Sequence, residues 1–151
     1  MMSWKQGLAF VFLMLAVILP FAIYQENASL NAHMVEVNET NFDREVMAST
    51  IPVFVDVTAR DCSSVACTEH RRLVAQLARE YLGKVKFVRI YVDDFPEAVT
   101  LFSVSRVPEE VIVIADQTGS LKELAHADGS SHKAALRIHL NQAMMSTRAE
   151  R

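Results

Sequence analysis

The hydrophobic and polar positions after residue 33 predict five strands. Two strongly apolar runs, Val53–Val57 and Val111–Ile114, are typical of strands buried on both faces. Lys86–Val92 predicts a third strand of the same sheet. Shorter stretches at Met34–Val37 and Leu121–Ala125 predict edge strands.

Apolar residues at helical spacing predict helices between these strands. The longest runs from about Cys67 to Leu82, and Gly83 is placed to end it. Short helices are expected after Asn38–Asn41 and over Pro96–Phe102, and a final helix after the loop at Asp128–Ser131. This order predicts an α/β fold, with a central mixed sheet flanked by helices on both faces.

A separate apolar segment, Gly7–Tyr24, contains no charged residue. At about 1.5 Å per residue it would span roughly 27 Å, close to a bilayer core of about 30 Å. It is longer than the usual core of a signal peptide, and no clear cleavage site follows it. An uncleaved transmembrane anchor is therefore favoured over a cleaved signal. Lys5 precedes the segment and Glu26 follows it, so the positive-inside rule predicts that the rest of the chain is exported.

The 151 residues, 51 % of them hydrophobic, suit one compact domain plus this segment. The expected parts are an anchor or signal segment at 1–24, a linker at 25–33, the α/β domain at 34–145 and a disordered tail at 146–151. All 18 acidic residues and all but one of the 15 Lys and Arg follow the anchor. They form no basic stripe, so nucleic acid is not an expected partner.

Candidate chemistry centres on the two cysteines, Cys62 and Cys67, between the central strand and the long helix. A helix N-terminus favours the thiolate form of a nearby cysteine. In one continuous helix, residues five apart point about 140° away from each other, so a disulfide requires Cys62 to precede the helix. A redox pair, a static disulfide and two free thiols all fit this pattern.

His70 completes a Cys-x4-Cys-x2-His pattern that could bind Cu(I) or Zn²⁺. No fourth ligand is apparent, and a single histidine on a helix face is usually solvated. Neither a metal nor a cofactor is therefore predicted.

In order along the chain, several segments resemble the thioredoxin family, and the resemblance extends from Val35 to Met144. Pro52–Ala59 resembles the family's central strand, with Asp56 six residues before Cys62 as the family's buried Asp precedes its first active-site cysteine. Further resemblances are to the family's second helix, third strand, following turn and cis-proline, at Leu77–Val88, Val92–Pro96 and Val107–Pro108.

The resemblance implies a thioredoxin-like fold and thiol–disulfide exchange on exported proteins. Cys62 would be the nucleophile and Cys67 the resolving thiol. Asp56, its pKa raised by burial, would move the proton of Cys67. The groove beside the cis-proline would hold the substrate chain, and the expected substrate-binding residues are Asp61, Val107, Pro108 and Glu109. Asp61 and Glu109 would make this groove acidic, which favours a basic or polar protein partner.

The predicted site also departs from the family. Cys62 and Cys67 are separated by two residues more than in Cys-Gly-Pro-Cys, Asp61 stands where the family has Trp, and Glu109 where it usually has Thr. The negative charge of Asp61 is expected to raise the pKa of Cys62 and weaken it as a nucleophile. The alternative is a redox-inactive thioredoxin-like binding module in a membrane assembly. Either protein is expected at a bacterial inner membrane, with its domain in the periplasm, or free there if the segment is cleaved.

Overall fold

The structure is a computed structural model, in which residues 14, 16, 32–116 and 118–149 are described. The chain divides into two units, residues 1–32 and 33–151. Apart from residues 14, 16, 32 and 33, the predicted anchor and linker lie outside the described residues. Within the described part of the chain, no helix is both long and apolar enough to cross a bilayer.

A five-stranded mixed sheet forms the centre of the second unit, as the sequence predicts. Its strands are β1 (Val35–Val37), β2 (Val53–Thr58), β3 (Lys86–Tyr91), β4 (Glu109–Ala115) and β5 (Leu121–Asp128). Their order in the sheet is β1-β3-β2-β4-β5. The strands β1 and β2 are parallel to β3, whereas β4 is antiparallel to β2 and to β5.

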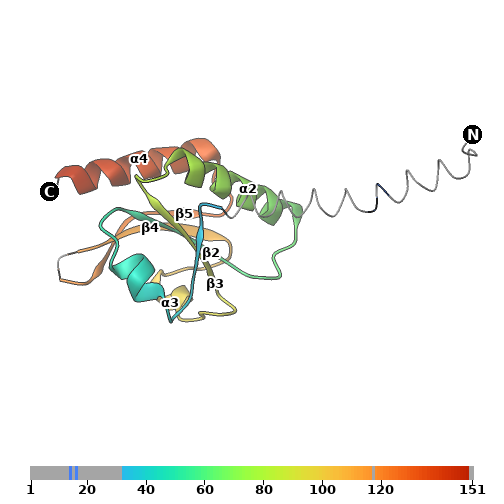
Figure 1. Cartoon of the computed structure of the whole chain (residues 1–151), viewed down its shortest axis with the longest axis horizontal. Helices are drawn as coiled ribbons and strands as arrows, with labels where there is room; N and C mark the ends of the chain where they lie inside the picture. The colour runs from blue at the N-terminus through green and yellow to red at the C-terminus, as the bar shows by residue number, and fades with distance from the viewer. Residues whose placement is uncertain (1–13, 15, 17–31, 117, 150–151) are drawn as a thin grey trace, which may run out of the picture. The chain divides into compact units, whose positions relative to one another are not determined.

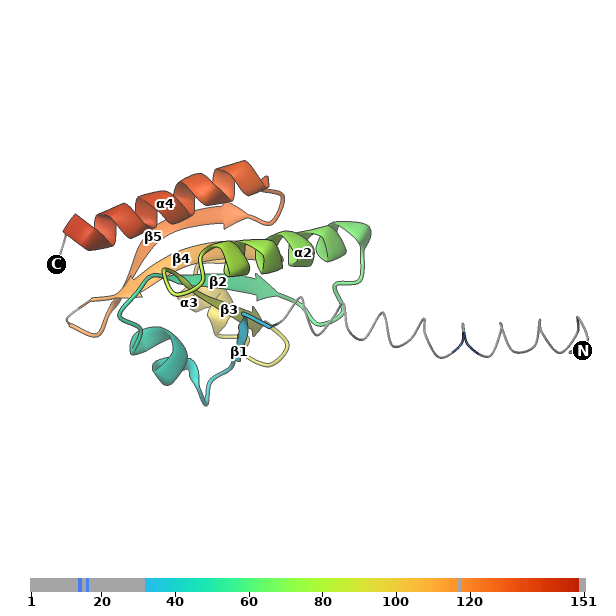
Figure 2. The same ribbon diagram turned by 45° about the horizontal axis from the view of Figure 1, so that its top comes forward.

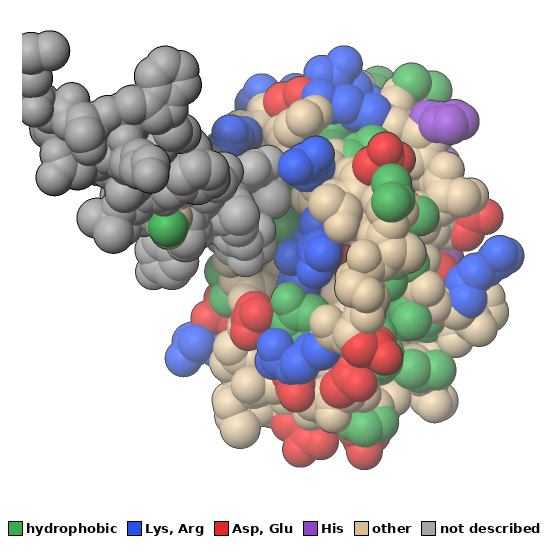
Figure 3. Space-filling view, turned by 90° about the vertical axis from the view of Figure 1, so that its right-hand side faces the viewer, with side chains coloured by type: hydrophobic (Ala, Val, Ile, Leu, Met, Phe, Trp, Pro, Cys, Tyr) green, Lys and Arg blue, Asp and Glu red, His purple; other side chains and the backbone are tan. Residues whose placement is uncertain are grey.

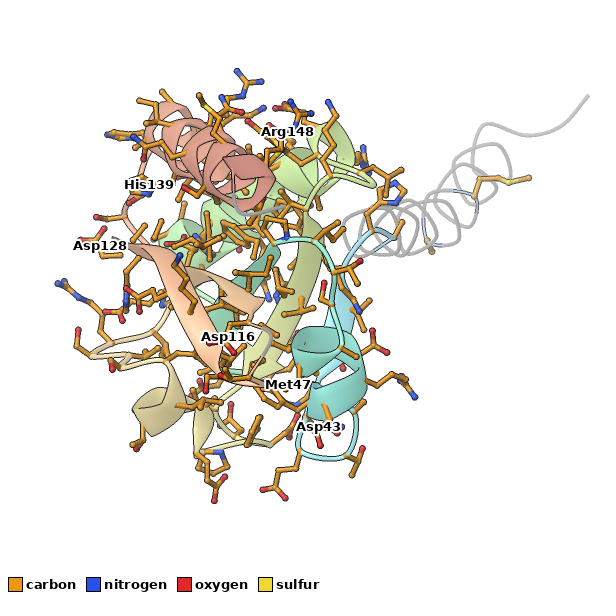
Figure 4. All side chains as sticks on the ribbon, turned by 90° about the vertical axis from the view of Figure 1, so that its left-hand side faces the viewer. Asp43, Met47, Asp116, Asp128, His139 and Arg148 are labelled. Carbon is orange, nitrogen blue, oxygen red and sulfur yellow. A yellow bond between two sulfur atoms is a disulfide. The ribbon has the colours of Figure 1, made fainter. Side chains whose placement is uncertain are left out.

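Helices cover both faces of this sheet (Figures 1 and 2). They are η1 (Asp43–Met47), α2 (Val65–Glu80), α3 (Ala98–Leu101) and α4 (Lys133–Ala149). The helices α2 and α4 lie side by side over one face, joined by ion pairs from Glu80 to Lys133 and Arg137. In Figure 4, η1 (labelled at Asp43 and Met47) lies on the opposite side of the sheet from α4 (labelled at His139 and Arg148).

The alternation of side chains along β2 divides the core into two layers. Val53, Val55 and Val57 pack with Val46 of η1 and Phe102, just after α3. Phe54 faces the other way and packs with residues of α2 and α4. Because Asp56 is two residues after Phe54, it shares this second face and lies beneath the helices.

Several boundaries differ from the sequence prediction, among them the start of β4 and the end of the last helix. The strand β4 begins at Glu109, two residues before the expected Val111, because the sheet accommodates two glutamates that the apolar pattern leaves out. The last helix continues to Ala149, so residues 146–149, expected in a disordered tail, are helical.

Candidate functional site

Cys62 and Cys67 form a disulfide across the start of α2, with their Cα atoms 5.8 Å apart. That separation is within the range usual for disulfides. Cys62 precedes the helix, as a bond between the two sulfurs requires. It is half-buried, whereas Cys67 is only 7 % exposed, and the four residues between them are all exposed. A reactant from solvent therefore reaches Cys62 more easily than Cys67.

The N-cap of α2 holds the backbone of Cys67 in place. Ser64 is the N-cap, and its Oγ accepts a hydrogen bond from the backbone N–H of Cys67 at 3.2 Å. The cap satisfies one of the free N–H groups of the first turn. Cys67 is the third residue of the helix, and Cys62 lies two residues before the cap. The helix N-terminus thus lies between the two sulfur-bearing residues rather than directly at Cys62.

Arg60 holds the loop that leads from β2 to Cys62. Its backbone N–H donates to Asp93 at 2.8 Å, and its guanidinium donates to Asp94. The same guanidinium lies 4.1 Å from the ring centroid of Tyr91. These contacts attach the loop to the end of β3 and the turn that follows. Asp61, next along the chain, is exposed.

Asp56 is fully buried and is bound by two donors. Its Oδ2 accepts from Nε of Arg89 at 2.7 Å, and its Oδ1 lies 3.0 Å from Nε2 of His70. Burial raises the pKa of Asp56, but the hydrogen bond from His70 and the charge of Arg89 outweigh it, so the pKa is below its usual range. The expectation of a raised pKa was therefore wrong, because it considered burial without these partners.

A second buried carboxyl, Glu110, lies directly opposite Asp56 in the pairing of β2 with β4. It is 1 % exposed, and its Oε1 is 3.1 Å from Nδ1 of His70. Burial raises the pKa of Glu110 to about 9, and the negative charge of Asp56 adds to the rise. Glu110 is thus protonated at neutral pH.

Arg89, Asp56 and Glu110 form a row across β3, β2 and β4, which His70 contacts from α2. We call these four residues the buried quartet. The expectation that His70 is solvated was wrong, since it is 7 % exposed. Its spacing from Cys67 was the available signal, because residues three apart share a helix face. No pattern in the sequence indicated that Glu110 contacts His70.

The predicted substrate groove centres on Pro108. The peptide bond between Val107 and Pro108 is cis, as the resemblance implies, and Val107 is partly exposed. The backbone oxygen of Pro108 accepts a hydrogen bond from the N–H of Gly129 at 2.9 Å. Loops before β4 and after β5 are thereby joined at this point. Substrate binding by Asp61, Val107, Pro108 and Glu109 remains a prediction.

Glu109 follows Pro108 but is buried, at 4 % exposure. Its carboxylate accepts from the N–H and Oγ of Ser105, and Nε2 of His126 is 3.1 Å away. Burial raises its pKa, but these bonds outweigh the burial, so the pKa of Glu109 is below its usual range. Its charge is compensated inside the domain, and Asp61 alone of the two acids is exposed.

Lys and Arg side chains are interspersed with Asp and Glu on the face shown in Figure 3. The described side chains there give no large patch of a single sign. Among the described residues, no three His, Cys, Asp or Glu side chains are arranged to hold a metal ion.

Comparison with known proteins gives one family match and several relatives. The thioredoxin family model matches residues 33–142. Thioredoxin from Haemophilus influenzae is 30 % identical over 95 residues, which cover 60 % of this chain and 87 % of that protein. Thioredoxin 1 from Nostoc sp. is 30 % identical over 77 residues, covering 51 % of this chain and 70 % of the relative. Chloroplastic thioredoxin M3 from Oryza sativa is 32 % identical over 68 residues, 45 % of this chain but only 38 % of the relative's length.

Proposed function

Because this chain belongs to the thioredoxin family, we propose that it exchanges thiols and disulfides with exported proteins through Cys62 and Cys67. Thioredoxin relatives and a disulfide-bonded cysteine pair support a thiol–disulfide redox function in general. The observation that carries the proposal is the disulfide at the start of α2, with one accessible and one buried cysteine.

In the direction of substrate reduction, the Cys62 thiolate attacks one sulfur of a substrate disulfide. The substrate S–S bond breaks, and its electron pair leaves on the other substrate sulfur. Cys67 then loses its proton and attacks Sγ of Cys62. The bond between Cys62 and the substrate breaks, the second substrate thiolate leaves, and the Cys62–Cys67 disulfide of the structure results. The same steps in reverse oxidise a substrate dithiol.

Asp56 would exchange the proton of Cys67 in these steps. Its carboxylate is ionised and lies on the sheet face that α2 covers, the helix that carries Cys67. The two donors that lower its pKa also make it a weaker base than an unpartnered buried carboxylate. This supports a proton role for Asp56 that depends on its neighbours.

The proposed location is the periplasmic side of a bacterial inner membrane. The support is the apolar segment Gly7–Tyr24, which has the length of a single membrane span and is preceded by Lys5. Protein substrates in the exported compartment would meet the domain there.

Trapping of mixed disulfides tests the proposed chemistry. We expect Cys67→Ser to accumulate a covalent adduct with a peptide disulfide, because Cys62 still attacks but nothing resolves the bond. Cys62→Ser is the matched control and should accumulate far less, since its remaining thiol is buried. Non-reducing electrophoresis with mass spectrometry would identify the adduct. If neither variant forms one and Cys62→Ser keeps its protein partners, the chain is instead a binding module with a static disulfide.

A further inference from the structure

The buried quartet extends beyond the residue that the proposed chemistry uses. We propose that Asp56, His70 and Glu110 form one proton-carrying chain, in which Glu110 holds the proton while the disulfide is closed and gives it up toward Cys67 when the disulfide opens. This inference rests on the proposed function of Cys62 and Cys67. His70 and Glu110 act through Asp56 and are therefore positioning residues.

The contacts allow one consistent direction for the hydrogen bonds. Asp56 is ionised and only accepts, so Nε2 of His70, 3.0 Å away, donates to it. In the proposed arrangement Nδ1 of His70 accepts, and the nearby donor is the carboxyl O–H of Glu110, 3.1 Å away. Neither oxygen of Glu110 has a hydrogen-bond partner of good geometry in the described part of the chain.

The charges of the neighbouring groups explain why the proton rests on Glu110. Asp56 on β2 and Asp128 on β5 oppose a negative charge there, as does Glu109 beside it on β4. Arg89 on β3 is the cation of the row, and it is bound to Asp56. His70 on α2 supplies the remaining contact. A protonated Glu110 thus leaves the row neutral, with the charges of Asp56 and Arg89 cancelling.

The acidity of Glu110 also suits exchange with a cysteine. Its pKa of about 9 lies close to the ordinary value of about 8.5 for a thiol. Transfer of a proton between two such groups is near energetic balance, which is the condition for efficient proton exchange. Asp56, with its lowered pKa, passes the proton on but does not retain it.

The position of Cys67 on α2 makes its sulfur the acceptor of the transferred proton in this proposal. Cys67 and His70 are both buried and lie one turn apart on the same face of α2. When a thiolate attacks Sγ of Cys62, the Cys62–Cys67 bond breaks and its electron pair goes to Sγ of Cys67. That sulfur takes a proton from the Asp56 end of the chain. The proton on Nε2 of His70 moves to Asp56, and that of Glu110 moves to Nδ1, leaving Glu110 as a carboxylate.

Two measurements on the full chain test this inference. The first is infrared spectroscopy of the oxidised protein at pH 7. A protonated carboxyl band is expected in the wild type and in Glu109→Gln, whose carboxylate is ionised, but not in Glu110→Gln. A band that survives in Glu110→Gln, or no band in the wild type, overturns the inference.

The second measurement is the rate of disulfide opening by dithiothreitol as a function of pH, normalised to its thiolate. In the wild type the rate should fall as pH rises through about 9, because Glu110 loses its proton. Glu110→Gln should be about tenfold slower at pH 7, less than the effect of a direct general acid, and should lose this decline. His70→Gln interrupts the same proton path at its other contact and should behave like Glu110→Gln. Glu80→Gln is the control: Glu80 lies at the far end of α2, in ion pairs with Lys133 and Arg137, and its replacement should leave the rate and the pH profile as in the wild type.

The proposed proton transfer is contradicted if Glu110→Gln leaves the rates and the pH profile unchanged, or if His70→Gln keeps the wild-type profile. A purely structural role would lower stability in these variants without removing the decline near pH 9. Failure of the proposed function is a separate result. In that case dithiothreitol opens the Cys62–Cys67 disulfide of the wild type, but the protein exchanges with no peptide disulfide. The pH profile of disulfide opening then still tests the proposed proton transfer.

Discussion

At the scale of single residues, Glu110 should make the fold less stable as pH rises. In the unfolded chain its carboxyl loses a proton near 4.5, but in the folded domain it keeps the proton up to about 9. Between these values the unfolded state binds fewer protons, so Glu110 lowers the free energy of unfolding by about 1.4 kcal/mol per pH unit. Its stabilising contribution is thus complete below pH 4.5 and lost as pH rises toward 9.

We therefore expect the free energy of unfolding of Glu110→Gln, measured by urea unfolding, to rise relative to that of the wild type as pH increases from 5 to 8. Glu109→Gln is the matched control. The pKa of Glu109 is lowered, so its ionised form contributes stability that is lost only as pH falls into the acid range. Parallel pH curves for Glu110→Gln and the wild type would show that Glu110 is ionised in the folded domain.

Gly129 should be intolerant of a side chain because it packs against Pro108. A Cβ at Gly129 would lie 2.9 Å from the backbone carbon of Pro108 and closer still to its oxygen. We expect Gly129→Ala to lose about 1–3 kcal/mol of stability, as overpacked positions do, and to slow exchange with a peptide disulfide. Chemical unfolding and an exchange assay measure the two effects.

Gly119→Ala is a control that separates a general loss of stability from an effect on the substrate site beside Pro108. Gly119 has a φ of +77° and nothing within 4 Å of its Cβ position. Its replacement should cost stability through the backbone alone and leave the exchange rate unchanged. Equal exchange rates in Gly129→Ala and the wild type would show that Pro108 does not shape the substrate site.

The sequence predicted the individual residues of the site better than their interactions. The cysteine pair, the burial of Asp56 and the cis bond before Pro108 followed from local pattern and family resemblance. The lowered pKa of Asp56 did not, because Arg89 and His70 come from other elements. The partnership of Glu110 depends on the register of β4 against β2, which a single sequence does not specify.

At the scale of elements, the start of α2 determines how firmly Cys67 is held. Ser64→Ala removes the cap and leaves the N–H of Cys67 without its acceptor. We expect a loss of about 1 kcal/mol in stability and faster hydrogen exchange at Cys67. Ser63→Ala, one residue earlier and exposed, is the control and should change neither. Equal protection in both variants would mean that the cap does not hold the first turn.

Strand and helix types followed from hydrophobic periodicity, and most boundaries came within a few residues. The start of β4 was missed because Glu109 and Glu110 break the apolar pattern, although both are buried with partners on opposite faces of the sheet. The start of α2 was placed at Cys67 because Val65 and Ala66 precede the clear periodicity. The actual signal was the N-cap residue Ser64.

At the scale of the whole domain, the strand order creates the buried quartet. The order β1-β3-β2-β4-β5 places β2 between β3 and β4, so ionisable residues of three strands meet in one row below α2. The α/β class and the mixed sheet were predictable from the succession of elements. The family resemblance added the cis-proline and the position of the buried acid. Anchoring by Gly7–Tyr24 remains a prediction, because all of that segment except residues 14 and 16 lies outside the described residues.

The most direct test of the account is the reduction potential of the Cys62–Cys67 pair in the full chain. Alkylation and mass spectrometry across glutathione buffers would measure the fraction of disulfide at each potential. We predict a reversible two-electron couple between about −120 and −270 mV, the range of working thiol–disulfide oxidoreductases. A disulfide that stays closed below about −300 mV would be a structural bond and would contradict the proposed exchange.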